Sequence, residues 1–71
     1  MKTYTFEILT LGNVWKPVFC RSGNSTDKET GCSVIACNTA RPYRTWGKDN
    51  AEKDLAYFTK FAGEGRVRIA Q

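Results

Sequence analysis

The chain has 71 residues, which is enough for one domain with a small core. Its composition, 41% hydrophobic and 13% aromatic, excludes a disordered chain. Eleven Lys and Arg against seven Asp and Glu give a net charge of +4, and the absence of histidine excludes mechanisms that need a histidine base, nucleophile or metal ligand. Because no apolar run approaches the ~18 residues of a membrane span, and no signal-peptide pattern is present, we expect a protein without a membrane partner.

Two strands joined by a tight turn are expected first. In residues 3–11, Tyr4, Phe6 and Ile8 alternate with polar side chains, which is the period of a strand. Gly12-Asn13 suits a two-residue type II′ turn, with residues 14–21 as the return strand. This turn predicts that Phe6 pairs with Phe19 and that Val18 points to the opposite, mixed face. The predicted core face of the hairpin contains Tyr4, Phe6, Ile8, Trp15, Pro17 and Phe19.

The middle of the chain predicts a loop and shorter strands. Residues 21–31 contain no large apolar side chain and are expected to form a surface loop. Residues 32–38 contain a continuous apolar run and are expected to form a strand. Part of residues 39–47, with the sequence TARPYRTWG, is expected to form a short edge strand.

A helix and a final strand complete the predicted fold. Asp49 and Glu52 have the spacing of a capping box, with Asp49 as the N-cap, and Gly63 is placed to end the helix. Residues 66–69 alternate as a last strand. We therefore expect an α+β fold in one domain spanning residues 1–71, with the order β-β-β-(β)-α-β. A single, mainly antiparallel sheet of three to five strands packs one amphipathic helix on one face.

The cysteines favour a cytoplasmic protein without a metal. Cys20, Cys32 and Cys37 form an odd set, whereas small secreted domains usually carry an even disulfide framework. A structural zinc site usually needs four Cys or His ligands. We expect three reduced thiols, a cytoplasmic location, and neither a metal nor another cofactor.

The strongest candidate site lies at residues 41–48, where basic and aromatic side chains interleave. Lys and Arg contact phosphates, and aromatic rings stack on bases. The final strand is expected to add two outward-facing arginines to the same surface. The candidate binding residues are Arg41, Tyr43, Arg44, Trp46, Lys48, Arg66 and Arg68.

The expected function is binding rather than catalysis, with no catalytic residues. The expected partner is nucleic acid or a complex that contains it, and the oligomeric state is left open. One alternative is a protein-binding inhibitor of a host defence complex, of the anti-CRISPR type, with no direct nucleic-acid contact. Another is a small ribonuclease toxin that works without histidine, through Arg41, Tyr43, Arg44 and Arg68.

Three segments, RPYRTW, AEKDLAYFTKFAG and RVRI, carry a resemblance. They resemble small proteins of plasmids and phages, which often end in an Arg-rich strand, an amphipathic helix and a short strand. The resemblance covers less than half of the chain and implies an origin in a phage or another mobile element. Many very small phage proteins bind and block one host complex.

Overall fold

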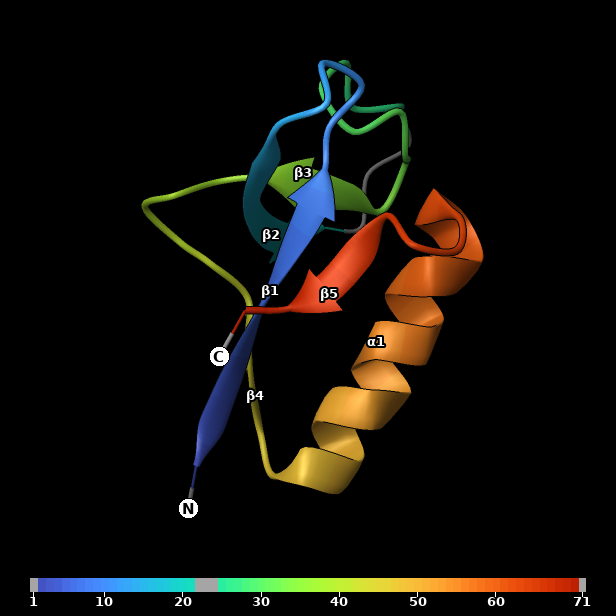
Figure 1. Cartoon of the computed structure of the whole chain (residues 1–71). Coiled ribbons are helices and arrows are strands. Elements are labelled where there is room, and N and C mark those ends of the chain that lie inside the picture. Colours follow the sequence, from blue (N-terminus) through green and yellow to red (C-terminus); the bar gives the residue numbers. More distant parts are fainter. Residues whose placement is uncertain (1, 22–24, 71) are drawn as a thin grey trace.

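The computed structural model describes residues 2–21 and 25–70, in one antiparallel sheet and one helix (Figure 1). The elements are β1 Thr3–Leu9, β2 Trp15–Cys20, β3 Ile35–Cys37, β4 Arg44–Trp46, α1 Lys48–Ala62 and β5 Val67–Ile69. The sheet curls, and α1 packs against one of its faces. The expected α+β fold is thereby confirmed. None of the described helical segments is long and apolar enough to cross a membrane.

Strand β1 is the centre of the sheet because it pairs with three others. Strand β5 lies along one edge of β1, where Leu9 donates its N–H to Arg66 and Thr5 accepts from Ala70. Strands β2 and β4 share the other edge. Strand β2 pairs with the second half of β1, and β4 pairs with Thr3–Thr5 in the first half.

The chain between β3 and β4 crosses over β2. The carbonyl oxygen of Pro17 accepts the N–H of Asn38 at 3.2 Å, and that of the next residue, Val18, accepts the N–H of Tyr43 at 2.8 Å. Consecutive carbonyls of a strand point to opposite edges, so the chain moves from one edge of β2 to the other. It arrives beside β1, where it forms β4.

The register of the first hairpin differs from the prediction by one residue. In the structure Glu7 lies opposite Pro17, and Leu9 lies opposite Trp15. The loop contains three residues, and its last residue, Asn13, has φ 63°, a left-handed conformation that Asn tolerates well. The predicted two-residue turn and the Phe6–Phe19 pair are therefore wrong.

This shift exchanges the two faces of β2, because side chains alternate along a strand. Val18 becomes fully buried in the core. Trp15, Pro17 and Phe19 instead lie on the face of the sheet that points away from α1, together with Glu7 and Thr5 of β1.

The helix begins two residues before its predicted cap. Its N-cap is Gly47, with φ 84°, and the N–H of Gly47 donates to Lys2 at 3.0 Å. Glycine reaches this positive φ without steric cost, so the chain turns directly from β4 into α1. Asp49 lies in the first turn and makes no capping hydrogen bond. The predicted end is confirmed, since the N–H of Gly63 donates to Thr59 at 2.8 Å.

The segment before β3 is mostly not strand. Strand β3 covers only Ile35–Cys37, shorter than expected. In the preceding loop Thr30 is fully buried, and its Oγ1 donates to the carbonyl of Ile35 at 2.6 Å. Residues 22–24 of the predicted surface loop lie outside the described residues.

The core fills the space between α1 and the sheet. Its largest fully buried side chains are Phe6, Phe58, Ile8, Ile35 and Val18. The rings of Phe6 and Phe58 meet edge to face with their centroids 5.3 Å apart, a favourable geometry for aromatic pairs. Phe6 therefore joins the sheet to the helix.

We expect Phe6→Ala to lower the free energy of unfolding by about 3–5 kcal/mol, because it removes a fully buried ring. Phe19→Ala removes the same atoms from the half-buried outer side of β2 and should cost clearly less. Urea unfolding of both variants measures the difference. Equal losses would contradict the observed register.

Candidate nucleic-acid interface

The face of the sheet opposite α1, here called the outer face, combines arginine and aromatic side chains. Thr3, Thr5 and Glu7 of β1 point to it, because they alternate with the buried Phe6 and Ile8. The neighbouring strands place their side chains beside these residues according to the register. They contribute Trp15, Pro17 and Phe19 from β2, Arg44 and Trp46 from β4, and Arg68 from β5.

Arg68 forms the centre of one cluster on the outer face. Its guanidinium carbon lies 3.9 Å from the centroid of the Trp15 ring. Its Nε donates to Oε1 of Glu7 at 2.9 Å, and its Nη2 forms an ion pair with the same oxygen at 2.8 Å. The indole and the carboxylate thus hold the guanidinium on the outer face, while about half of the Arg68 side chain stays exposed.

Arg41 and Arg44 supply positive charge without an acidic partner among the described residues. The guanidinium of Arg41 lies 6.0 Å from the centroid of the Phe19 ring. Arg44 lies opposite Thr5 and is exposed. Both arginines are therefore open to an anionic ligand.

Trp46 and Lys48 extend this surface toward the start of α1. Trp46 lies opposite Thr3 and exposes 59% of its surface, a large fraction for tryptophan. Lys48 is exposed in the first turn of the helix. Both tryptophans of the protein thus lie on the outer face. Trp46 lies in β4, and Trp15 lies beside Arg68 of β5.

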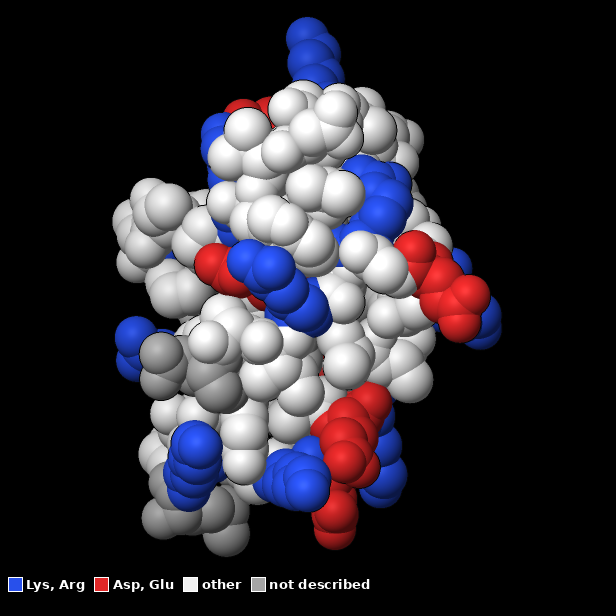
Figure 2. Space-filling model, viewed as in Figure 1, with Lys and Arg blue, Asp and Glu red and all other residues white. Residues whose placement is uncertain are grey.

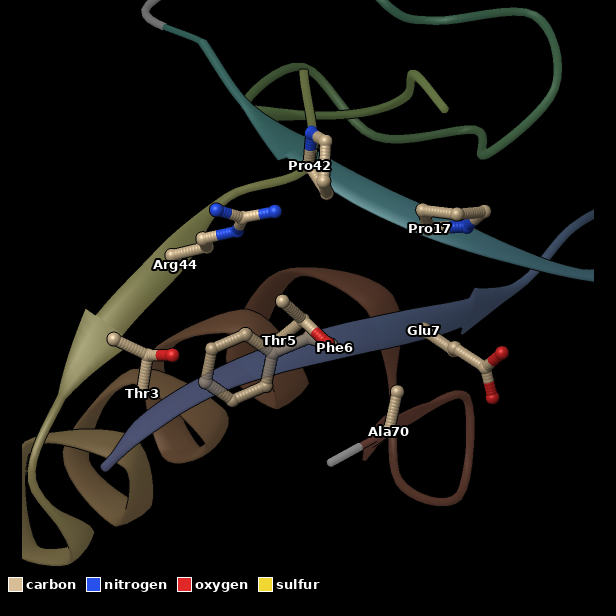
Figure 3. A pocket seen from close by; sticks show the side chains of 8 residues that line it. All are labelled: Thr3, Thr5, Phe6, Glu7, Pro17, Pro42, Arg44 and Ala70. Carbon is tan, nitrogen blue, oxygen red and sulfur yellow. The ribbon is translucent and has the colours of Figure 1, made fainter. Parts of the chain in front are cut away.

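An open cleft of about 650 Å³ lies on the outer face (Figure 3). Strand β1 forms its floor at the place where its partner changes from β2 to β4. In Figure 3, Thr3 and Arg44 lie at one end of the cleft, and Glu7 and Pro17 at the other. Its lining consists of Thr3, Thr5, Phe6, Glu7, Pro17, Pro42, Arg44 and Ala70.

The structure places Tyr43 in the core rather than on the outer face. Its ring packs against Phe6 and Phe58, with centroids 6.0 and 5.5 Å away. Its hydroxyl donates to Oδ2 of Asp54 in α1 at 2.8 Å. Burial, together with this hydrogen bond, raises the pKa of Tyr43 to about 12. The four residues considered for a ribonuclease site therefore do not converge, because this hydroxyl faces the helix and the three arginines do not.

Arg66 also serves the fold, and it does not share the surface of Arg68. Its guanidinium donates to three backbone carbonyls, those of Leu9 at 2.8 Å, Thr30 at 3.1 Å and Ala62 at 3.1 Å. These carbonyls belong to the end of β1, the loop before β3 and the last turn of α1. Arg66 therefore joins three segments, and most of its donors are directed at the backbone rather than at a ligand.

Figure 2 shows both signs of charge on the face that it displays. The larger acidic patches lie on the side of α1 with basic side chains directly beside them, and further basic side chains are scattered over the rest of this view. Residues 2–21 and 25–70 contain no group of three or more Cys, Asp or Glu side chains that could hold a metal ion. The outer face offers arginine and aromatic contacts to a ligand.

Trp15 and Phe19 are the site residues that the sequence analysis missed. A two-residue turn at Gly12-Asn13 would place both side chains in the core. The signal that could have found them is the tolerance of Asn for a left-handed conformation, which allows a three-residue loop that ends at Asn13. With that loop, Val18 faces the core and Phe19 does not.

Comparison with protein-family models, with curated proteins and with solved structures found no match to this chain.

The Tyr43–Asp54 bond predicts a loss of stability at alkaline pH. Because the folded-state pKa of Tyr43 is raised above the ordinary value of 10.0 to about 12, its contribution is fully present below pH 10 and is lost as the pH rises toward 12. Tyr43→Phe should cost about 1–2 kcal/mol at neutral pH and reduce this alkaline decline. Urea unfolding at a series of pH values measures both. A decline of the same size in the variant would contradict the assignment.

Arg66→Ala should lower the free energy of unfolding by about 2–3 kcal/mol, because it leaves three carbonyls without their charged donor. The matched control is Arg68→Ala, which removes an exposed ion pair and should cost less than about 1 kcal/mol. Thermal unfolding compares the two variants. A larger loss for Arg68→Ala would reverse the assigned roles.

Proposed function

We propose that this protein binds single-stranded nucleic acid, RNA or DNA, on its outer face. The observation that carries the proposal is the arrangement of three arginines among three aromatic rings on the sheet face that α1 does not cover. Sheet faces that are exposed to solvent are usually polar. Large aromatic side chains on such a face therefore indicate that it binds a ligand.

The chemistry of the face suits a single strand better than a duplex. Trp46 and Trp15 lie near opposite ends of β1, and bases that are not paired can stack on such rings. Arg41 and Arg44 lack acidic partners among the described residues, so they are free to contact phosphates. A β1 strand of seven residues spans about 20 Å, comparable to the binding sheets that stack two or three bases.

The binding surface differs from the predicted set of residues. It keeps Arg41, Arg44, Trp46, Lys48 and Arg68, and it adds the rings of β2. Tyr43 and Arg66 support it from within the fold.

We also propose a cytoplasmic location, supported by three free thiols. Burial raises the pKa of the Cys20 and Cys37 thiols, which lowers their reactivity. An origin in a phage or another mobile element remains an expectation from the sequence.

The double variant Arg41→Ala/Arg44→Ala tests the function. It should weaken binding of a single-stranded oligonucleotide at least about tenfold, because two phosphate contacts are lost. The slope of log affinity against log salt should become shallower by about 1.4, at ~0.7 per phosphate contact. The melting temperature should stay nearly unchanged, since both side chains are exposed and lie away from the core. Quenching of Trp15 and Trp46 fluorescence provides the titration signal.

The matched control is Lys28→Ala/Lys53→Ala, which removes equal charge from exposed positions elsewhere. It should bind within about twofold of the unchanged protein at physiological salt. Equal weakening by both double variants would show a net-charge effect and no site. Absence of binding to RNA and DNA oligonucleotides would contradict the function and favour the protein-binding inhibitor.

A further inference from the structure

The cleft on the outer face has two chemically different ends. At one end, Arg44 and the hydroxyls of Thr3 and Thr5 are hydrogen-bond donors (Figure 3). At the other end, Glu7 is an acceptor. Its Oε1 accepts from Nε of Arg68 and forms an ion pair with Nη2, and no described residue donates a hydrogen bond to its Oε2.

The sides of the cleft are apolar and rigid. Pro17 of β2 lies above β1, and so does Pro42 of the crossing segment, which is the chain between β3 and β4 (residues 38–43). Ala70 lies beyond the other edge of β1. Proline rings have fixed backbone geometry and no N–H group, so they offer flat surfaces that need no hydrogen-bond partner. A planar heterocycle can occupy such a space without leaving a polar group unpaired.

We propose that the cleft is a subsite for one nucleobase that carries an exocyclic amino group, cytosine, adenine or guanine, in a strand bound as proposed above. The amino group donates to Oε2 of Glu7, a contact that carboxylates make with cytosine N4. The neighbouring phosphate lies at the Arg44 end, away from the negative charge of Glu7. This inference rests on the proposed function and adds a base preference to it.

Thymine and uracil fit this cleft poorly. Their exocyclic groups are carbonyl oxygens, and these flank the only ring N–H on the pairing edge. That N–H can donate to Oε2 of Glu7, but the two flanking oxygens then lie beside the negative charge of the carboxylate, which weakens the contact relative to that of an amino group. The subsite therefore discriminates by repulsion as well as by attraction.

The test compares single-stranded oligo(dC), oligo(dA) and oligo(dT) of equal length, titrated by tryptophan fluorescence. The unchanged protein should bind oligo(dC) and oligo(dA) about tenfold more tightly than oligo(dT), the scale of one good base contact. In Glu7→Gln this ratio should fall below about twofold, while the affinity for oligo(dT) stays equal or increases. The control Glu64→Gln removes the same charge from an exposed position and should keep the tenfold ratio.

The outcomes separate this inference from the proposed function. Equal affinity of the unchanged protein for all three oligonucleotides would overturn the subsite and leave single-strand binding intact. Uniform weakening of all three by Glu7→Gln would mean that Glu7 only positions Arg68, which also overturns the subsite. Absence of binding to any of them would overturn both.

Discussion

Tyr43 donates its backbone N–H to the carbonyl of Val18 at 2.8 Å, and this bond fixes which strand completes the sheet. It holds the segment between β3 and β4 beside β2. Strand β4 can then pair with the first half of β1, on the same edge whose second half pairs with β2. The same bond sets the direction of Tyr43 toward the core and of Arg44 toward the outer face. The cleft, the arginine beside it and the exposed Trp46 all depend on this change of partner along one edge.

Arg66 and Arg68 are only two residues apart, but their positions in the backbone give them different roles, one in the fold and one on the outer face. Arg66 precedes β5, where the ends of β1 and α1 and a loop leave carbonyls without helix or sheet partners, and its guanidinium satisfies three of them. Arg68 lies inside β5, where the backbone is already paired with β1. Its side chain is therefore available to the outer face, where Trp15 and Glu7 orient it.

Most of the fold follows from local patterns in the sequence, and the register does not. Alternation in residues 3–9, the apolar stripe of α1 and Gly63 indicate the correct elements. The choice between a two-residue and a three-residue loop depends on the conformation of Asn13 alone, and it decides the side on which Trp15 and Phe19 lie. The cleft could not be predicted, because its lining comes from β1, β2, Pro42, β4 and Ala70, which meet only through long-range pairing.

The pairing of β1 with β5 joins residues 6–8 to residues 67–69, almost the full length of the described chain. A fold built on such distant contacts forms slowly for its size, because closing a long loop costs entropy before any contact is made. During synthesis on the ribosome, the emerging β1–β2 hairpin has no stable partner for its apolar face until α1 and β5 have left the exit tunnel. The apolar face of the hairpin therefore stays exposed to solvent for longer than the hairpin itself needs to form.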